Sequence, residues 1–341
     1  MDEGDSRRLA LETVEARCRR ALENAGAGPA HAAAVAGAAV TAEAEGNQAV
    51  GLAHLLDYLA GLDDGRIAGD AEPRLEAVTP IVTRIDAAGG MQHLGIDRAF
   101  DGVVAAAREY GLAAVASRNG FTVGALSYYP RRLAQAGLAG MAFANAAPAI
   151  MPGSGGTRAR FCTNPMAFAV PAGVDAPPVV IDQSSTASAL VAIKQAADRG
   201  ERIPEGWALG PDGASTTDPV AALAGVLLPF GGARGANVAL LVELMAAGLT
   251  GADWSWSSPP FDSGAQAPDL GCFLLAIDPE RTAGPGYRAE VQRLVDCLHA
   301  DGAFVPGIGK ARAAAAAVRD GIVPDPDVWA RIEARADAAA G

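Results

Sequence analysis

The segments TNPMAFAVPAG (residues 163–173), VVIDQSS (179–185) and LLPFGGARG (227–235) decide how the centre of the chain folds. Met166–Val170 and Val179–Ile181 are short apolar runs between turn-forming residues, a pattern typical of buried strands. In the last segment, glycines surround Arg234 immediately before the apolar residues 236–249, which have the composition of a helix. We therefore predict two buried strands and a glycine loop at a helix N-terminus, a favourable position for an anion.

Outward from this centre the pattern predicts helices and strands without regular alternation. No predicted strand is followed by a GxGxxG turn; the nearest approach, GSGG at residues 153–156, follows a proline and opens no helix. This disfavours a Rossmann domain. Helices are predicted from Ser6 to Ala44 (two, with a break at 26–29), and at 51–62, 96–110, 122–135, 188–199, 236–249, 286–300 and Asp327–Ala339; strands at 78–86, 112–117, 138–144 and 272–277; and mostly loop at 202–222.

The composition is that of an ordinary globular protein. Half of the 341 residues are hydrophobic, 19% are charged and the net charge is −12. The negative charge disfavours nucleic acid and anionic membranes as partners, and no uncharged apolar run reaches the ~18 residues that cross a bilayer. The four cysteines are far apart, so no metal site or disulfide framework is predicted. Met1–Asp5 lacks the basic and apolar regions of a signal peptide, so we predict a cytoplasmic protein.

Several long motifs resemble those of the malate/L-lactate dehydrogenase family of the sulfolactate type, which includes piperideine- and pyrroline-2-carboxylate reductases. They are the segments from Thr163 and Leu227, IPEGWALGPDGASTTDP from Ile203, RNGFTVGALSYY from Arg118 and CFLLAIDP from Cys272, and the likeness spans roughly residues 45–335 in order. The resemblance implies an α/β fold in which a non-Rossmann, largely antiparallel sheet binds NADPH or NADH, beside a helical layer. It also implies a homodimer with the active site near the interface, a helical and dimerisation domain (residues 1–75 plus 285–341) and a domain for cofactor and substrate (76–284).

The cofactor contacts that the resemblance implies lie mostly in these motifs. Asp182 ends an apolar strand and is expected to contact the cofactor or orient a catalytic group, although it could instead cap the helix that follows. Arg234 could hold a cofactor phosphate or a substrate carboxylate, or be a solvated surface residue. The full expected set is Asn119, Thr163, Asn164, Pro165, Asp182, Ser184, Gly232, Arg234 and Gly235.

The substrate end departs from the family pattern. The family has Ser-His-Gly at the start of the third helix and an Arg one turn later; here the His position is Val50 and the Arg position is His54. The family's second His, its usual general acid/base, is Thr122 here. Three further family residues are also replaced: a Lys at Ala192, the His-Lys pair at Ala233 and Arg234, and an Arg at Phe304.

Candidate residues for chemistry follow from these positions. His54, Asp182 and Thr122 are the catalytic candidates, and Asn145, Val50 and Tyr58 the substrate-binding ones. His93 could be solvent-exposed or belong to the site, whereas His31 and His299 are expected at the surface. Tyr58, Tyr128 and Tyr129 are alternative proton donors, although aromatic residues at helical spacing are more often core. Trp254 and Trp256 are expected in an interface or lid loop.

The missing histidines favour one reaction over another. Reduction of a ketone develops negative charge on oxygen and needs a proton donor, for which a threonine hydroxyl is too weak an acid. A cyclic imine can enter already protonated, so hydride transfer quenches a positive charge. We therefore expect an NAD(P)H-dependent reductase of a small carboxylated imine, or a proton donor supplied elsewhere. Reduction of 2-oxo acids, oxidation of 2-hydroxy acids, and a nucleotide-binding protein without redox chemistry remain alternatives.

Overall fold

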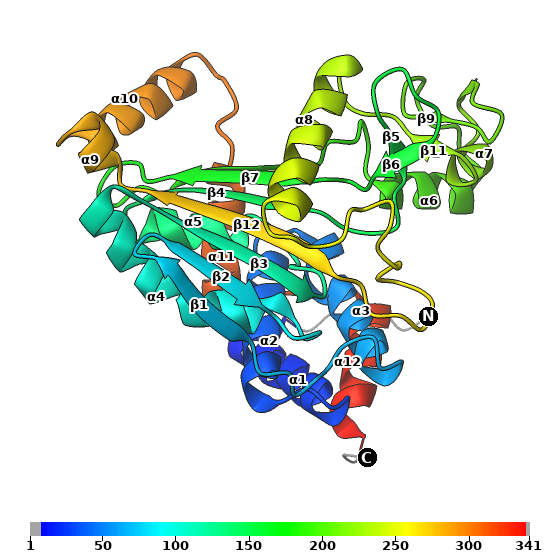
Figure 1. Cartoon of the computed structure of the whole chain (residues 1–341), viewed down its shortest axis with the longest axis horizontal. Coiled ribbons are helices and arrows are strands. Elements are labelled where there is room, and N and C mark those ends of the chain that lie inside the picture. The colour runs from blue at the N-terminus through cyan, green and yellow to red at the C-terminus, as the bar shows by residue number, and fades with distance from the viewer. Residues whose placement is uncertain (1–7, 339–341) are drawn as a thin grey trace.

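The computed structural model describes residues 8–338; the predictions for Met1–Asp5, Ser6 and Ala339 lie outside these residues. A seven-stranded sheet forms the centre, in the order β1-β2-β3-β12-β4-β7-β8 (Figure 1). All neighbours run antiparallel except β2 and β3, so the predicted α/β fold with a largely antiparallel sheet is confirmed. The strands are β1 (Arg74–Thr79), β2 (Val82–Asp86), β3 (Leu112–Gly120), β4 (Ala139–Ala144), β7 (Met166–Val170), β8 (Val179–Gln183) and β12 (Leu270–Ile277).

Helices cover both faces of this sheet. On one face, α4 (Gln92–Tyr110) and α5 (Tyr128–Gln135) bury Val103 and Leu133 against strand residues such as Val115. On the other face, α8 (Ala233–Glu243) and the π-helical turn Leu244–Gly248 pack Val242 and Ala246 against Phe143 of β4. The sheet therefore has an apolar layer on each face. These layers hold the strands, and with them the strand ends, in place.

A helical layer joins the two ends of the chain below the sheet (Figure 1). It consists of α1 (Leu11–Asn24), α2 (Pro29–Ala44), α3 (Leu52–Asp63), α11 (Ile308–Asp320) and α12 (Pro326–Asp337), with η1 (Gln48–Val50) before α3. Their common core contains Leu22, Leu55 and Ile332. Two other C-terminal helices, α9 (Pro279–Ala283) and α10 (Tyr287–Ala300), lie at the opposite end of the sheet.

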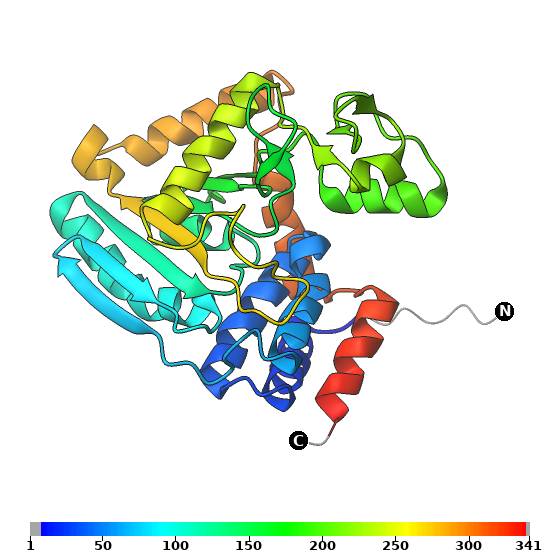
Figure 2. The same ribbon diagram turned by 45° about the vertical axis from the view of Figure 1, so that its right-hand side comes forward.

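A small lobe projects beside the sheet (Figure 2). Its own core includes Ile193, Ile203 and Ala222. It contains α6 (Leu190–Arg199), α7 (Pro219–Leu223) and the three-stranded sheet β9 (Ala208–Leu209), β10 (Ser215–Thr216) and β11 (Val226–Leu227); the hairpin β5 (Met151–Pro152) and β6 (Ala159–Phe161) lies next to it.

Two local predictions were wrong, and one helix was missed. Residues 78–86 belong to a hairpin, whose first strand is exposed throughout and therefore lacks an apolar pattern. The helix predicted from Thr122 begins at Tyr128, so residues 122–127 are free to line a cavity. Residues 202–222 are mostly loop, as predicted, although they include two short strands and the start of α7; α11 was missed. No described helix has the length and apolarity needed to cross a membrane.

Candidate active site

A cavity of about 510 Å³ lies where the helical layer meets the ends of the central strands. It receives residues from the start of α3, the loop after β3, the ends of β4 and β8, and the loop before β7. Its ionisable lining residues are His54, Asp182 and Lys310. The other lining residues that bear on its chemistry are Val50, Thr122, Asn145, Thr163, Pro165, Gln183, Ser184 and Phe261.

Main-chain hydrogen bonds hold three sequence motifs together at one side of this cavity. The Ser185 N–H donates to the Thr163 carbonyl at 2.8 Å, which joins the end of β8 to the loop before β7. The Phe230 N–H donates to the Ser185 carbonyl at 3.1 Å, and the Ala187 N–H donates to the Leu228 carbonyl at 2.8 Å. The residues 163–165, 182–187 and 228–235 therefore form one continuous frame.

A second cavity, also about 510 Å³, lies on the other side of residues 184–190. Gly231 and Gly232 line it with φ values of +56° and +63°, and an added Cβ at either glycine would meet open space. Gly232 is the N-cap of α8, so the first N–H groups of that helix lie beside the cavity. Ser188 follows Ala187 of this cavity and precedes Ala189 of the first, and its hydroxyl is buried and without a partner among the described residues. These features fit a nucleotide with its phosphates at the helix N-terminus.

The structure brings most of the predicted cofactor residues to these two cavities. Thr163, Pro165, Asp182 and Ser184 line the first, and Gly232 lines the second. Arg234 is exposed in the first turn of α8, next to the glycine loop.

Three predicted cofactor residues contact other parts of the protein and do not line either cavity. Asn119 donates to the Asp86 carboxylate at 2.7 Å and has φ +54°, which fixes the turn after β2. Asn164 is fully buried and donates to the Ala239 carbonyl and to the Glu243 carboxylate. At Gly235 a Cβ would lie 1.9 Å from the Phe230 carbonyl oxygen, so this glycine is required by packing. Their side chains therefore support the frame rather than face a ligand.

Asp182 does not cap the helix that follows it, because α6 begins only at Leu190. Its carboxylate instead accepts a hydrogen bond from the Ser127 N–H at 3.1 Å, and Ser127 is the N-cap of α5. A carboxylate is stabilised at a helix N-terminus by the dipole and the free N–H groups. This contact holds the negative charge of Asp182 at the cavity wall.

The start of α3 is held by a buried carboxylate. Glu43 accepts the Leu52 N–H at 3.0 Å, and burial raises the pKa of its carboxyl group. Gly51 is necessary there, because a Cβ would lie 2.5 Å from the Glu43 Oε2 atom. The bond presents Val50 and His54 to the cavity. Asn145 also lines it, but its amide is engaged by the Asp253 carbonyl and the Gly271 N–H, both at 2.8 Å.

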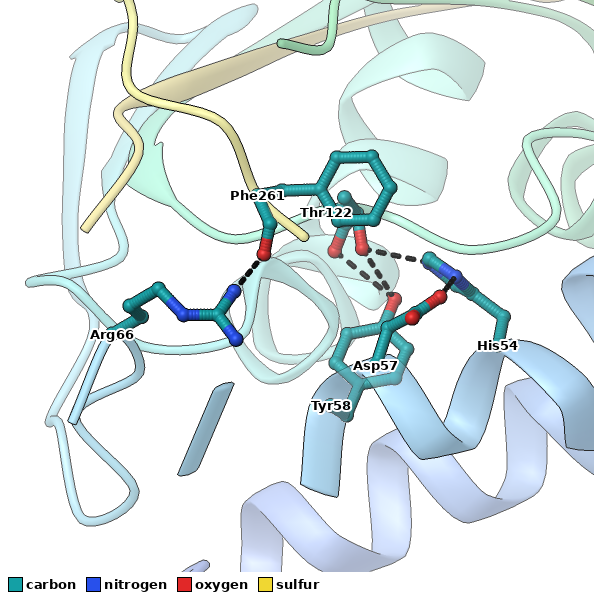
Figure 3. A network of polar contacts seen from close by, with 6 residues as sticks. All are labelled: His54, Asp57, Tyr58, Arg66, Thr122 and Phe261. Atoms are coloured by element: carbon teal, nitrogen blue, oxygen red, sulfur yellow. Dashed lines mark hydrogen bonds and ion pairs between the residues drawn. The ribbon is translucent and has the colours of Figure 1, made fainter. Parts of the chain in front are cut away.

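His54 lies at the centre of a polar network (Figure 3). Its Nδ1 atom is 2.7 Å from the Asp57 carboxylate and its Nε2 atom is 2.9 Å from the Thr122 hydroxyl. The Tyr58 hydroxyl is 3.1 Å from the Thr122 Oγ1 atom and donates to the Thr122 carbonyl at 3.2 Å. Phe261 packs edge-on against the His54 ring, and its carbonyl accepts a hydrogen bond from Arg66. The structure thus brings His54, Thr122 and Tyr58 together.

The other histidines and tyrosines do not line the cavity. His93 is buried between Tyr58 and Tyr129, and burial lowers its pKa to about 3, which corrects the expectation of solvent exposure. His31 was expected at the surface but is buried, with its Nε2 atom 2.7 Å from the Ala71 carbonyl; His299 is exposed as expected. Tyr129 donates to the Val123 carbonyl from the core, and Tyr128 packs on Arg132.

Three residues of this region were missed from the sequence. Asp57 was detectable, because it is three residues after His54 on the same helix face. Lys310 is one of two lysines in the chain, but its distance in sequence from the motifs hid its place in the cavity. Phe261 follows Pro259 and Pro260 in an irregular loop, and nothing in the local pattern indicated it. Trp256, in that same loop, is exposed and has Arg160 over its ring, and its predicted interface or lid role stays a prediction.

Comparison with known proteins places these cavities in context. The family profile of malate/L-lactate dehydrogenases matches residues 9–333. The (2R)-3-sulfolactate dehydrogenase (NADP(+)) of Chromohalobacter salexigens is 39% identical over 305 residues, covering 89% of this chain and 90% of that protein. The Delta(1)-pyrroline-2-carboxylate reductase of Ancylobacter novellus is 40% identical over 273 residues, covering 80% of each. The crystal structure of delta1-piperideine-2-carboxylate reductase from Pseudomonas syringae superposes with a TM-score of 0.91 at 30% identity, covering 96% of this chain and 99% of that one.

Proposed function

This chain belongs to the malate/L-lactate dehydrogenase family, and from that premise we propose that it is an NAD(P)H-dependent reductase of a small, carboxylated cyclic imine. The relatives from Ancylobacter novellus and Pseudomonas syringae, by name, reduce pyrroline- or piperideine-2-carboxylate. The cavity of about 510 Å³ has room for one such ring beside a nicotinamide.

One observation carries the choice of an imine. The Asp182 carboxylate lines the cavity, and among the described residues it has a single hydrogen-bond donor, the Ser127 N–H. The two positions at which the family has histidine are occupied here by Val50 and Thr122, and neither side chain brings a positive charge to Asp182. A protonated C=N group would place a positive charge beside the Asp182 carboxylate, in addition to the charges of Lys310 and Arg131, whereas the oxyanion that develops from a ketone would be repelled by this carboxylate.

The remaining groups of the cavity have roles that follow from their charge. Lys310 provides a cation for the carboxylate of the substrate. Thr163, Pro165 and Ser184 would hold the nicotinamide end of the cofactor, and Gly232 with Arg234 its phosphates. When bound, the reduced nicotinamide supplies hydride to the C=N carbon. The chain's own residues orient the ring, balance its charge and exclude water with Phe261.

Reduction of 2-oxo acids, or oxidation of 2-hydroxy acids, is a second candidate. It is favoured by the 39% identity to a sulfolactate dehydrogenase and by the His54–Thr122 contact, which could provide a proton donor. Nucleotide binding without redox chemistry is a third reading, which predicts nicotinamide binding and no turnover.

The test measures the oxidation of NADPH and of NADH by the change in nicotinamide absorbance. One arm contains piperideine- and pyrroline-2-carboxylate, the other 2-oxo acids, each over a range of pH. We expect turnover on the imines at least about tenfold above that on 2-oxo acids, the ratio that corresponds to 1.4 kcal/mol. Equal rates would overturn the choice of imine, and cofactor binding without turnover would favour the third reading.

We also propose a cytoplasmic homodimer, with dimerisation by the terminal segments (residues 1–75 and 285–341). Support comes from apolar side chains left exposed in α10 and next to it, Leu294 at 59% and Phe304 at 81%. Large exposed apolar side chains that gather on one surface indicate a protein contact. Light scattering of the purified protein would give the mass, and a monomer at micromolar concentration would contradict the proposal.

A further inference from the structure

Asp57 fixes which nitrogen of His54 carries a proton when the ring is neutral. The Asp57 carboxylate accepts only, so the Nδ1 atom at 2.7 Å donates to it. The neutral ring then has an unprotonated Nε2 atom, which accepts the hydrogen of Thr122 at 2.9 Å. In the charged ring Nε2 donates instead, and the Thr122 hydrogen is released to point elsewhere.

Thr122 and His54 are the members of this network that line the cavity. Thr122 lines it from the loop after β3, and the end of β8 that carries Asp182 lines the same cavity. Among residues 8–338, its released hydrogen has one acceptor, the Tyr58 oxygen at 3.1 Å. Tyr58 passes no proton on, because burial raises the pKa of its phenol above the usual range and its hydrogen is donated to the Thr122 carbonyl. A substrate atom in the cavity is the other acceptor.

The groups that face His54 come from several elements of the fold. From α3 it faces Asp57, whose side chain is 41% exposed and open to solvent, and Tyr58. From α4 comes His93, which burial keeps neutral. The loop residue Phe261 covers the ring, with Arg66 bonded to its carbonyl, and across the cavity lie Asp182 and Lys310.

We infer that Asp57, His54 and Thr122 form a proton relay to the substrate that replaces the histidines absent at positions 50 and 122. The inference rests on the proposed reduction. The nitrogen of the neutral imine takes the Thr122 hydroxyl proton while Thr122 takes the Nε2 proton of charged His54, which gives the protonated C=N group. The C=N carbon then receives hydride from the reduced nicotinamide, and the C=N electron pair moves to nitrogen. The products are the cyclic amine, the oxidised nicotinamide and neutral His54, which regains its proton from solvent. Thr122 is the catalytic residue and Asp57 a positioning residue.

The first test removes the hydroxyl of Thr122. Thr122→Val keeps the shape of the side chain and should lower kcat for imine reduction by about 100-fold or more, the contribution typical of general acid catalysis. Thr122→Ser should restore most of it, and neither change should alter the dissociation constant of the cofactor by more than about twofold. A Thr122→Val enzyme within twofold of the wild type would overturn the relay.

The second test removes the acceptor that fixes the His54 ring. Asp57→Asn should lower kcat for imine reduction by at least about tenfold with KM unchanged, because an amide no longer requires the Nδ1 atom to carry the proton. The matched control is Asp63→Asn, on the same helix, whose carboxylate pairs with Arg335 at the surface and should leave kcat unchanged. A kcat that does not fall in Asp57→Asn would overturn the positioning role.

Nitrogen-15 NMR of the His54 ring separates failure of the relay from failure of the proposed function. The neutral ring should carry its proton on Nδ1 in the wild type, and in Asp57→Asn part of the neutral population should carry it on Nε2. An Nε2–H form in the wild type would overturn the relay. An enzyme inactive on all imines and 2-oxo acids would overturn the proposed function instead, while the NMR result would still decide the Asp57–His54 pairing.

Discussion

The two sides of the central cavity are built from different kinds of interaction. On the side of the glycine loop, residues 163–165, 182–187 and 228–235 are held mainly by main-chain hydrogen bonds, such as Phe230 N–H to the Ser185 carbonyl. On the side of α3, the contacts are between side chains: His54 with Asp57, and Thr122 with His54 and Tyr58.

This difference explains where the chain keeps the family pattern and where it departs. A main-chain frame depends on backbone conformation, so it requires glycine and asparagine at a few positions and tolerates many side chains elsewhere. A side-chain network changes its chemistry with each substitution, as at Val50, His54 and Thr122. The cofactor side can therefore stay constant while the substrate side is rebuilt.

The largest expected effect comes from Gly235→Ala, which breaks the frame itself. The new Cβ would lie 1.9 Å from the Phe230 carbonyl oxygen, and backbone must move to admit it. We expect a loss of about 3 kcal/mol in the free energy of unfolding, at the upper end for overpacking, and at least tenfold weaker nicotinamide binding. Chemical denaturation and a fluorescence titration measure the two quantities.

Gly37→Ala is the control for this variant. Gly37 is inside α2 and an added Cβ meets nothing within 4 Å. Alanine should therefore raise helix stability by up to about 1 kcal/mol without changing cofactor binding. If Gly235→Ala behaved in the same way, the glycine loop would not be a rigid frame.

A smaller effect is expected from Val50→His, which changes only the substrate side. Val50 lines the cavity, so an imidazole there would face the substrate without disturbing a core. We expect kcat/KM for 2-oxo acids to rise about tenfold relative to imines, because an imidazole at this position supplies a general acid. Val50→Asn, of similar size and without a titrating group, should leave the ratio unchanged; an equal rise in both variants would exclude proton donation as the cause.

The sequence predicted the frame better than the network. The runs around Met166 and Val180 and the glycines before α8 have local signals, because strands, turns and helix starts impose them on nearby residues. The contact between His54 and Thr122 had no such signal, since Thr122 is 68 residues from His54 and the two meet only through the tertiary fold. His93 was misjudged for the same reason: its burial depends on Tyr58 and Tyr129, which come from other elements.

The last prediction compares two buried carboxylates, Glu43 on the α3 side and Glu243 on the glycine-loop side. Burial raises the pKa of Glu43 and of Glu243, so each group favours the folded state below the unfolded value of about 4.5, and that contribution is lost as pH rises through the raised folded pKa. Glu43→Gln removes the titration and still accepts the Leu52 N–H, so it should raise the free energy of unfolding by up to about 1 kcal/mol at pH 8 and by nothing at pH 4.

Glu243 differs because three donors converge on it: the Ser255 N–H, the Ser255 hydroxyl and the Asn164 amide. A glutamine there would turn its own N–H groups toward one of these donors, leaving a buried donor unsatisfied at a cost of about 1–3 kcal/mol. Glu243→Gln should therefore destabilise the protein at pH 8, opposite in sign to Glu43→Gln. Denaturation curves of both variants at pH 4 and pH 8 would measure these changes in the free energy of unfolding. A change of the same sign in both variants would mean that hydrogen bonds determine the glycine-loop side no more tightly than the α3 side.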